Sequence, residues 1–142
     1  MFVTLFLGLF DPSTGVLEYV NAGHLLPLVI QPESPVVPLG QPDNLALGIQ
    51  DTSFQASVAT IRRETGLLVF TDGITEARSP DNEEFGVNRV VNLLGTAGNR
   101  PVGEIVDSVV AAVEGFRQSC PQQDDITVFT LFYRESSDTA TV

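Results

Sequence analysis

The chain has 142 residues, a length typical of one domain with its own hydrophobic core. Hydrophobic residues make up 43% of it, with nine Phe, two Tyr and no Trp, as in globular rather than disordered proteins. Eighteen acidic residues outnumber seven basic ones, all of them arginine, and the formal net charge is −11. This charge argues against binding to nucleic acids or anionic membranes, and the lack of lysine excludes Walker-A loops and Schiff-base chemistry.

Single cysteine and histidine residues limit the chemistry further. Cys120 and His24 are each the only residue of their kind, so an internal disulfide and a multi-histidine zinc site are both excluded. The apolar start at 1–10 has no basic flank and is too short to span a bilayer. We therefore expect a cytoplasmic protein without a membrane segment.

Apolar runs predict strands in the first half of the chain and one more near its end. The predicted strands are 2–10, 16–21, 27–30, 53–61, 67–71 and 126–133. The first is apolar on both faces, which is typical of a strand buried on both sides. The segment DPSTG at 11–15 signals a turn, so the first two strands should form a hairpin. Four prolines at 31–45 predict a loop.

Two later segments carry apolar residues at helical spacing. The first stripe consists of Val87, Val90, Val91 and Leu94. The second runs from Val102 to Phe116 over four turns. Strands, then two helices, then a last strand predict an α+β fold.

Aspartates lie at the ends of two apolar strands. Asp72 follows the run LLVFT, and Asp124 and Asp125 precede the run ITVFTLFY. A carboxylate beside a buried strand is costly to desolvate unless something compensates its charge, and no lysine is available. Mg²⁺ or Mn²⁺, which prefers carboxylate and water ligands, would compensate it. The alternative is structural: Asp72 caps a helix or turn at 73–78, and Asp124 closes a turn.

Four motifs occur in an order that is typical of one protein family. They are YVNAGH at 19–24, LVFTDGITEA at 68–77, EEFG at 83–86 and QDDITV at 123–128. Together they resemble the catalytic domain of the SpoIIE/RsbU-type bacterial branch of the metal-dependent (PPM, type-2C-like) Ser/Thr phosphatases. The resemblance covers roughly residues 1–134, and the combination of TDGITEA with DDIT is specific.

This resemblance implies a fold, a site and a reaction. The fold is a four-layer αββα sandwich, in which two packed antiparallel sheets carry helices outside. Asp72 and Asp124 are implied metal ligands for Mn²⁺ or Mg²⁺, with two ions in the complete domain. Gly73 is implied to let the backbone approach the site, and Asp125 to lie just outside the ligand set. The implied reaction is hydrolysis of phosphoserine or phosphothreonine by a metal-activated water. Typical substrates are phosphorylated STAS-type antagonists of anti-sigma factors.

Two further side chains have competing interpretations. His24 lies just after the second strand of the hairpin, where type-2C relatives carry an aspartate near the metals. It either orients substrate or protonates the leaving serine oxygen, or it stabilises a turn by bonding to backbone. Glu76, one helical turn after Asp72, either supports the site or belongs to a solvated helix face. Glu84, Phe85 and Gly86 are expected to fix the loop after the TDG segment.

An earlier part of the family's domain carries a G-G-D-[FY]-[YF]-D element that is absent here. The only aspartate before residue 43 is Asp11, in the hairpin turn. We therefore expect residues 1–134 to be the C-terminal part of a phosphatase domain, followed by a disordered tail at 135–142. Unpaired sheet edges left by missing strands would favour a homodimer or aggregation. The alternative function is a truncated, inactive pseudo-phosphatase that binds a phosphoprotein without turnover.

Overall fold

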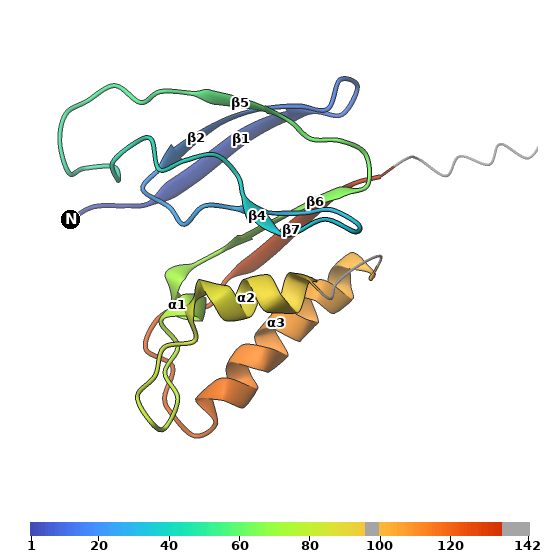
Figure 1. Ribbon diagram of the computed structural model, residues 1–142. Helices are drawn as coiled ribbons and strands as arrows, with labels where there is room; N and C mark the ends of the chain where they lie inside the picture. The colour runs from blue at the N-terminus through green and yellow to red at the C-terminus, as the bar shows by residue number, and fades with distance from the viewer. Residues whose placement is uncertain (96–99, 135–142) are drawn as a thin grey trace, which may run out of the picture.

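The computed structural model describes residues 1–95 and 100–134, which form two antiparallel sheets and three helices (Figure 1). The first sheet has the order β1-β2-β5, with β1 at Leu5–Asp11, β2 at Val16–Ala22 and β5 at Ser57–Thr60. The second has the order β4-β3-β6-β7, with β3 at Leu28–Ile30, β4 at Val37–Pro38, β6 at Thr65–Phe70 and β7 at Val128–Tyr133. The helices are α1 at Asp72–Thr75, α2 at Gly86–Gly95 and α3 at Val102–Arg117.

The predicted hairpin is confirmed. β1 and β2 pair in register from Leu5 opposite Ala22 to Asp11 opposite Val16. Both Ser13 groups, the hydroxyl and the backbone N–H, donate to Asp11 Oδ1 at 2.6 and 2.8 Å, and Thr14 Oγ1 donates to Oδ2 at 2.9 Å. These bonds, led by that of the Ser13 hydroxyl, lower the pKa of Asp11. The turn is therefore fixed by its own polar side chains.

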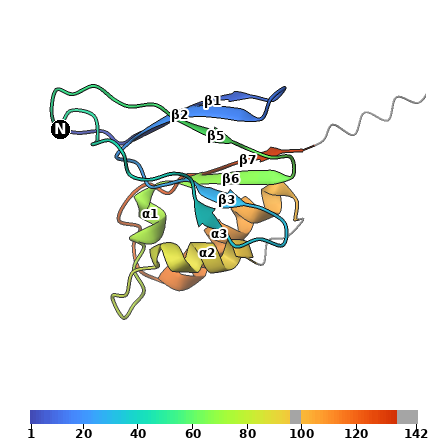
Figure 2. The same ribbon diagram turned by 45° about the horizontal axis from the view of Figure 1, so that its top comes forward.

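The sheets pack face to face, and the helices cover the outer face of the second sheet (Figure 2). One core lies between that sheet and the helices, around Leu68, Ile74, Val90 and Ile105, all fully buried. A smaller core between the sheets contains Leu17, Tyr19 and Leu67. The expected arrangement of two antiparallel sheets with external helices is thus confirmed. Over residues 1–95 and 100–134, helices cover only one of the two sheets.

The prediction that strand 2–10 is buried on both sides is wrong. β1 begins at Leu5 and is an edge strand of the first sheet. Phe6 and Phe10 face the smaller core, but Leu7 and Leu9 on the other face are 57% and 70% exposed. An apolar run shows that both faces of a strand carry apolar residues, but it does not reveal whether another layer covers each face.

Other predicted elements are confirmed with small shifts. Both helices form, and β2, β3, β5, β6 and β7 lie within or next to their predicted ranges. The short strand β4 falls inside the predicted loop at 31–45. The predicted tail at 135–142 lies outside the described residues. No helix within the described ranges is long and apolar enough to cross a bilayer.

Candidate active site

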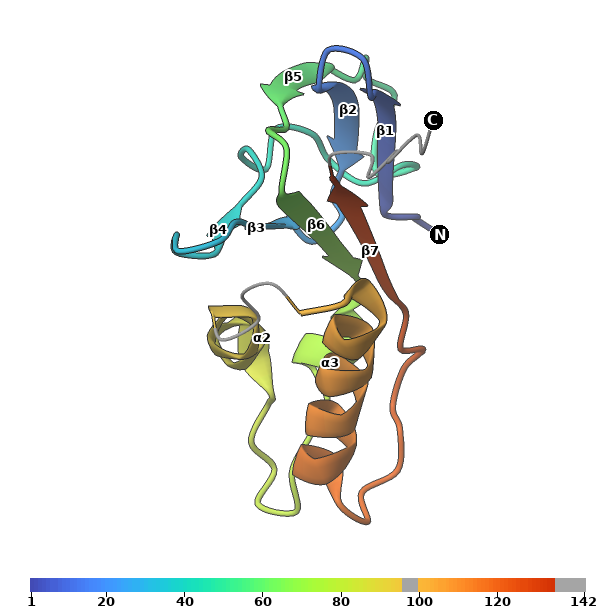
Figure 3. The ribbon, with the colours of Figure 1, turned by 90° about the vertical axis from the view of Figure 1, so that its right-hand side faces the viewer.

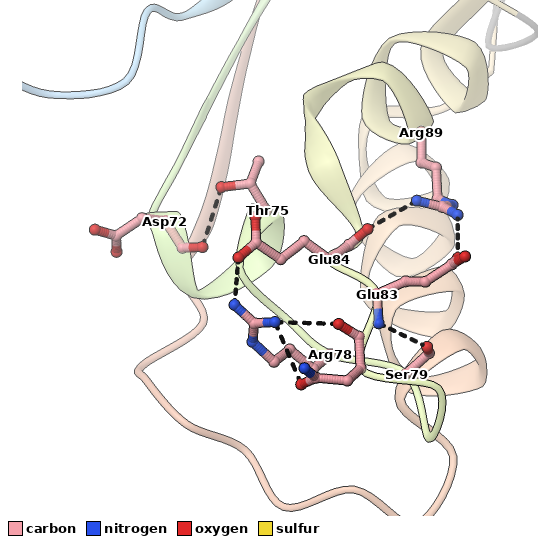
Figure 4. A network of polar contacts seen from close by, with 8 residues as sticks. Asp72, Thr75, Arg78, Ser79, Glu83, Glu84 and Arg89 are labelled. Atoms are coloured by element: carbon pink, nitrogen blue, oxygen red, sulfur yellow. Dashed lines mark hydrogen bonds and ion pairs between the residues drawn. The ribbon is translucent and has the colours of Figure 1, made fainter.

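Asp72 is placed at the point where a buried strand turns into a helix. β6 is one of the two inner strands of the second sheet, and Asp72 is the first residue of α1. The helix is capped by the extended backbone of Thr71 without a side-chain bond, so a capping role for the Asp72 side chain is not observed. Only the Asp72 carbonyl oxygen is used, accepting from Glu76 N at 2.8 Å and Thr75 Oγ1 at 3.1 Å. Among the described residues the exposed carboxylate has no hydrogen-bond or ion-pair partner, and it points away from the neighbouring arginines (Figure 4).

Gly73 brings the backbone of the second aspartate segment against α1. A Cβ atom at Gly73 would lie 2.5 Å from the Asp125 carbonyl oxygen and 3.2 Å from that of Asp124. Real Cβ atoms do not approach backbone oxygens so closely, so only glycine fits here. The expectation that this glycine permits a close backbone approach agrees with this packing. Because of it, Asp72 and the Asp124–Asp125 segment are neighbours although about fifty residues separate them.

Thr71 completes this junction, and its role was not predicted from the sequence. Its hydroxyl donates to the Asp125 carbonyl oxygen at 2.8 Å and accepts from Thr127 N at 2.9 Å. Its backbone N–H donates to Thr127 O at 3.1 Å. Asp125 therefore contributes its main chain to the junction. The same contacts hold the segment that carries Asp124.

One carboxylate oxygen of Asp124 accepts a hydrogen bond within its own turn. Its Oδ1 accepts from Asp125 N at 2.7 Å, and its carbonyl oxygen accepts from Gln122 Nε2 at 2.8 Å. The turn-closing interpretation is therefore correct for one carboxylate oxygen. The other oxygen has no partner among the described residues, and both Asp124 and Asp125 are exposed.

His24 is held beside Asp72 by its own loop. Its backbone N–H donates to Asn21 Oδ1 at 2.8 Å, and its carbonyl oxygen accepts from Asn21 Nδ2 at 2.9 Å. Its Nδ1 lies 2.9 Å from Leu25 O, which favours a proton on Nδ1 and leaves Nε2 available. The side chain lines a cavity of about 200 Å³ together with Asp72 and Glu76. The turn-stabilising contacts and a position at the site are thus both present.

Asp72 and Asp124 line two different hollows beside α1. The cavity with Asp72 and His24 also includes Thr71 and Thr75. A much smaller space of about 10 Å³ is lined by Gly73 and Asp124, and Glu76 borders both. Within residues 1–95 and 100–134 no group of three or more His, Cys, Asp or Glu side chains is close enough to hold a metal ion. The carboxylate oxygens of Asp72 and Asp124 are the type of ligand that a hard divalent cation prefers, but the described residues do not complete its coordination.

The loop after α1 is braced by the predicted motif EEFG. Arg78 pairs with Glu84 and also donates to Asn82, while Arg89 contacts the Glu84 carbonyl oxygen and the Glu83 carboxylate (Figure 4). Phe85 is buried, with its N–H bonded to Ala77 O at 2.8 Å. Gly86 takes a φ of 74°, a value that favours glycine. These contacts agree with the predicted role of the motif and anchor the end of α1.

Removing the Thr71 hydroxyl should loosen this junction. In Thr71→Val, the Asp125 carbonyl and the Thr127 N–H lose their shared partner, and we expect a loss of about 1–2 kcal/mol in the free energy of unfolding. Thr71→Ser keeps the hydroxyl and should lose less than about 1 kcal/mol. Urea denaturation of both variants measures the difference. Equal stabilities would show that the hydroxyl does not hold the segment.

The sequence matches a known protein family and a relative within it. The family model described as Stage II sporulation protein E (SpoIIE) matches residues 1–134. Protein IcfG of Synechocystis sp. (strain ATCC 27184 / PCC 6803 / Kazusa) is 33% identical over 132 residues, which are 93% of this chain and 21% of that protein.

Solved phosphatase domains share the fold. The SiaA-PP2C domain of Pseudomonas aeruginosa matches with a TM-score of 0.79 and 21% identity, over 91% of this chain and 51% of that one. The phosphatase domain of SpoIIE from Bacillus subtilis matches with a TM-score of 0.72 and 16% identity, over 94% and 60% of the two chains. The chain thus spans about a fifth of IcfG and between a half and two thirds of these solved chains. The family match and the sandwich with its TDG and DDIT junction lead to one conclusion: the chain belongs to the SpoIIE family and has the fold of PP2C-type phosphatase domains.

Proposed function

We propose that the chain is part of a Mn²⁺- or Mg²⁺-dependent phosphatase that hydrolyses phosphoserine or phosphothreonine on a regulatory protein. The observation that carries the proposal is the junction at Gly73, where two aspartate segments distant in sequence are packed together. Thr71 bonds to the second segment from the same place. The same packing buries Ile74 in the core, but both aspartates remain exposed beside it. This arrangement suits a site that needs carboxylates from two segments.

The metal assignment rests on the chemistry of the free oxygens. The Asp72 carboxylate and one oxygen of Asp124 have no partners among the described residues. They would hold the cation, with water in the remaining positions. Manganese and magnesium are both named for relatives: one SpoIIE phosphatase domain was presoaked with Mn, and RsbX was solved in complex with magnesium. Two ions would require further ligands from outside the described residues, because no third carboxylate joins these two.

The chain's own residues supply orientation and a proton donor. A bound divalent cation would acidify a water molecule and neutralise phosphoryl oxygens. His24 lines the same cavity as Asp72, so in its imidazolium form, with Nδ1–H held by Leu25 O, its Nε2–H would be placed to protonate the leaving serine or threonine oxygen. Thr71 and Gly73 keep the carboxylates in place, and Asp125 contributes its backbone rather than a metal bond.

The family supports a proposal for the substrate class. We propose a phosphorylated STAS-type protein that acts on an anti-sigma factor, in the cytoplasm. Relatives include the SiaA-PP2C domain and the RsbU and RsbW domains of Rv1364c from Mycobacterium tuberculosis, the latter solved in one chain. The net charge of −11 agrees with a protein substrate and argues against nucleic acid.

One observation favours a second function. The described residues contain no cluster of three metal-binding side chains, so these residues by themselves would hold a cation weakly. A pseudo-phosphatase would use the same fold to bind a phosphoprotein without turnover. The two functions differ in whether product is released.

The test is hydrolysis of a phosphoserine protein and of para-nitrophenyl phosphate, each with Mn²⁺ and with EDTA. We expect release of phosphate that requires Mn²⁺ and is absent with phosphotyrosine peptides. Binding of the phosphoserine protein without phosphate release would support the pseudo-phosphatase. Release of phosphate that EDTA does not reduce would contradict the metal-dependent mechanism.

A further inference from the structure

Asn21 is a polar residue in a core position. It lies on β2 in the same row as Leu17 and Tyr19, which belong to the core between the sheets. Asn21 is only 5% exposed, and burial of an amide is costly unless its polar atoms are hydrogen-bonded. Both ends of the amide bond to one residue: Oδ1 accepts from His24 N at 2.8 Å, and Nδ2 donates to His24 O at 2.9 Å. The buried amide therefore fixes the main chain of His24.

Asn44 makes the same pair of bonds to another residue. Its Oδ1 accepts from Gln55 N at 2.8 Å, and its Nδ2 donates to Gln55 O at 3.1 Å. The same Nδ2 also donates to the carbonyl oxygen of Asn21 at 3.2 Å. Figure 3 shows how this is possible: the connection between β4 and β5, which carries Asn44 and Gln55, passes the end of β2. Two parts of that connection are thus tied to the turn that carries His24.

Gly23 brings this turn against the same connection. Its φ is 70°, and a Cβ atom there would lie 2.8 Å from Ala46 N and 2.9 Å from Ala46 Cα. Only glycine fits so close to backbone atoms. The turn is therefore held both by the Asn21 amide and by the backbone at Ala46. In the turn so fixed, Leu25 O lies 2.9 Å from Nδ1 of His24.

The contact with Leu25 O determines which ring nitrogen is available for chemistry. A carbonyl oxygen only accepts hydrogen bonds, so it selects the ring forms that carry a proton on Nδ1. When an imidazolium ring gives its Nε2 proton to a leaving oxygen, it becomes neutral and keeps the proton on Nδ1. This product form is the one that Leu25 O stabilises. The geometry thus matches a histidine that exchanges protons at Nε2.

We propose that Asn21 and Asn44 are positioning residues for His24. They fix the turn so that Nδ1 bonds to Leu25 O and Nε2 exchanges protons with the substrate. The proposal rests on the proposed function, in which His24 protonates the leaving serine or threonine oxygen. Neither asparagine lines the cavity that His24 shares with Asp72, so both act through the turn.

The first test observes the His24 ring itself, through its imidazole nitrogen chemical shifts in NMR. His24 is the only histidine in the chain, so its signals are unambiguous. In the neutral ring, without metal ions, we expect the Nδ1–H form in the wild-type chain and a mixture of both tautomers in Asn21→Ala. Asn44→Ala should shift the signals in the same direction by a smaller amount. Asn88→Ala is the matched control, since Asn88 is exposed on α2, and it should change nothing.

The second test compares two substrates that differ in their leaving groups. Para-nitrophenolate leaves readily as an anion, whereas a serine oxygen needs a proton as it leaves. With Mn²⁺, we expect Asn21→Ala to lower kcat for a phosphoserine protein at least about tenfold, and kcat for para-nitrophenyl phosphate by less than about twofold. In a His24→Gln background, Asn21→Ala should cause no further loss with the phosphoserine protein.

Several outcomes would overturn the proposal. A wild-type ring in the Nε2–H form would do so, as would unchanged shifts in Asn21→Ala that is folded by circular dichroism. Equal losses with the two substrates would indicate a general loss of structure or metal instead of a misplaced proton donor. If Asn21→Ala does not fold, Asn44→Ala decides by the same measurements. A wild-type chain that releases no phosphate would contradict the proposed function, whereas the His24 shifts would still decide whether the two asparagines position the ring.

Discussion

Gly73→Ala is expected to lower the free energy of unfolding by about 2–3 kcal/mol and to weaken the response to Mn²⁺. The new methyl group would lie 2.5 Å from the Asp125 carbonyl oxygen and 3.0 Å from its carbonyl carbon. Both atoms belong to the backbone, which cannot move aside as the end of a flexible side chain can. The Asp124–Asp125 segment must therefore shift away from α1, at a cost typical of overpacking. Urea denaturation gives the stability, and Mn²⁺ titration gives the effect on the site.

Gly115→Ala is the matched control for this substitution. Gly115 also lies in a helix, α3, but a Cβ atom there would meet nothing within 4 Å. Alanine is the better helix former, so we expect this variant to gain about 0.5–1 kcal/mol. Equal free energies of unfolding for Gly73→Ala and Gly115→Ala would show that the two aspartate segments are not packed closely at Gly73.

Asp72→Asn is expected to reduce Mn²⁺-dependent phosphate release by about a hundredfold or more while leaving stability almost unchanged. The amide has nearly the same shape, but it carries no charge and is a poor ligand for a hard cation. The carboxylate has no partner among the described residues, so its loss should change the free energy of unfolding by less than about 0.5 kcal/mol. Phosphate release and urea denaturation together separate the functional effect from a folding effect.

Asp107→Asn tests whether any surface aspartate has this effect. Asp107 is exposed on α3, and its substitution by Asn removes the same negative charge as Asp72→Asn does. It should leave phosphate release unchanged. Equal activity of Asp72→Asn and the wild-type chain would remove Asp72 from the mechanism.

Local patterns in the sequence were sufficient for most elements. The turn at 11–15 was predictable because the groups that hold it, Asp11, Ser13 and Thr14, are neighbours in the chain. The two main helices were predictable because their apolar stripes recur with the helical period. Burial of β1 was not predictable, because it depends on which layers cover the sheet. The same apolar residues fit a covered strand and an exposed edge.

The site was predictable in part. The motifs around Asp72 and Asp124 pointed to one site, and the contacts at Gly73 agree with that expectation. Thr71 was missed because a β-branched residue at the end of an apolar run is typical of a strand. Its hydroxyl partners come from 54 and 56 residues further along the chain, and no local pattern signals such contacts. His24 could be placed near the site only through the resemblance, since its loop contacts are local and give no sign of Asp72.

The most direct test of the central claim is Mn²⁺ binding measured by isothermal titration calorimetry for the wild-type chain, Asp72→Asn, Asp124→Asn and the double variant. If the two carboxylates hold a common cation, each single substitution should remove most of the binding, and the double variant should be no weaker than either. Binding that neither substitution reduces, or losses that simply add, would contradict a cation shared by Asp72 and Asp124.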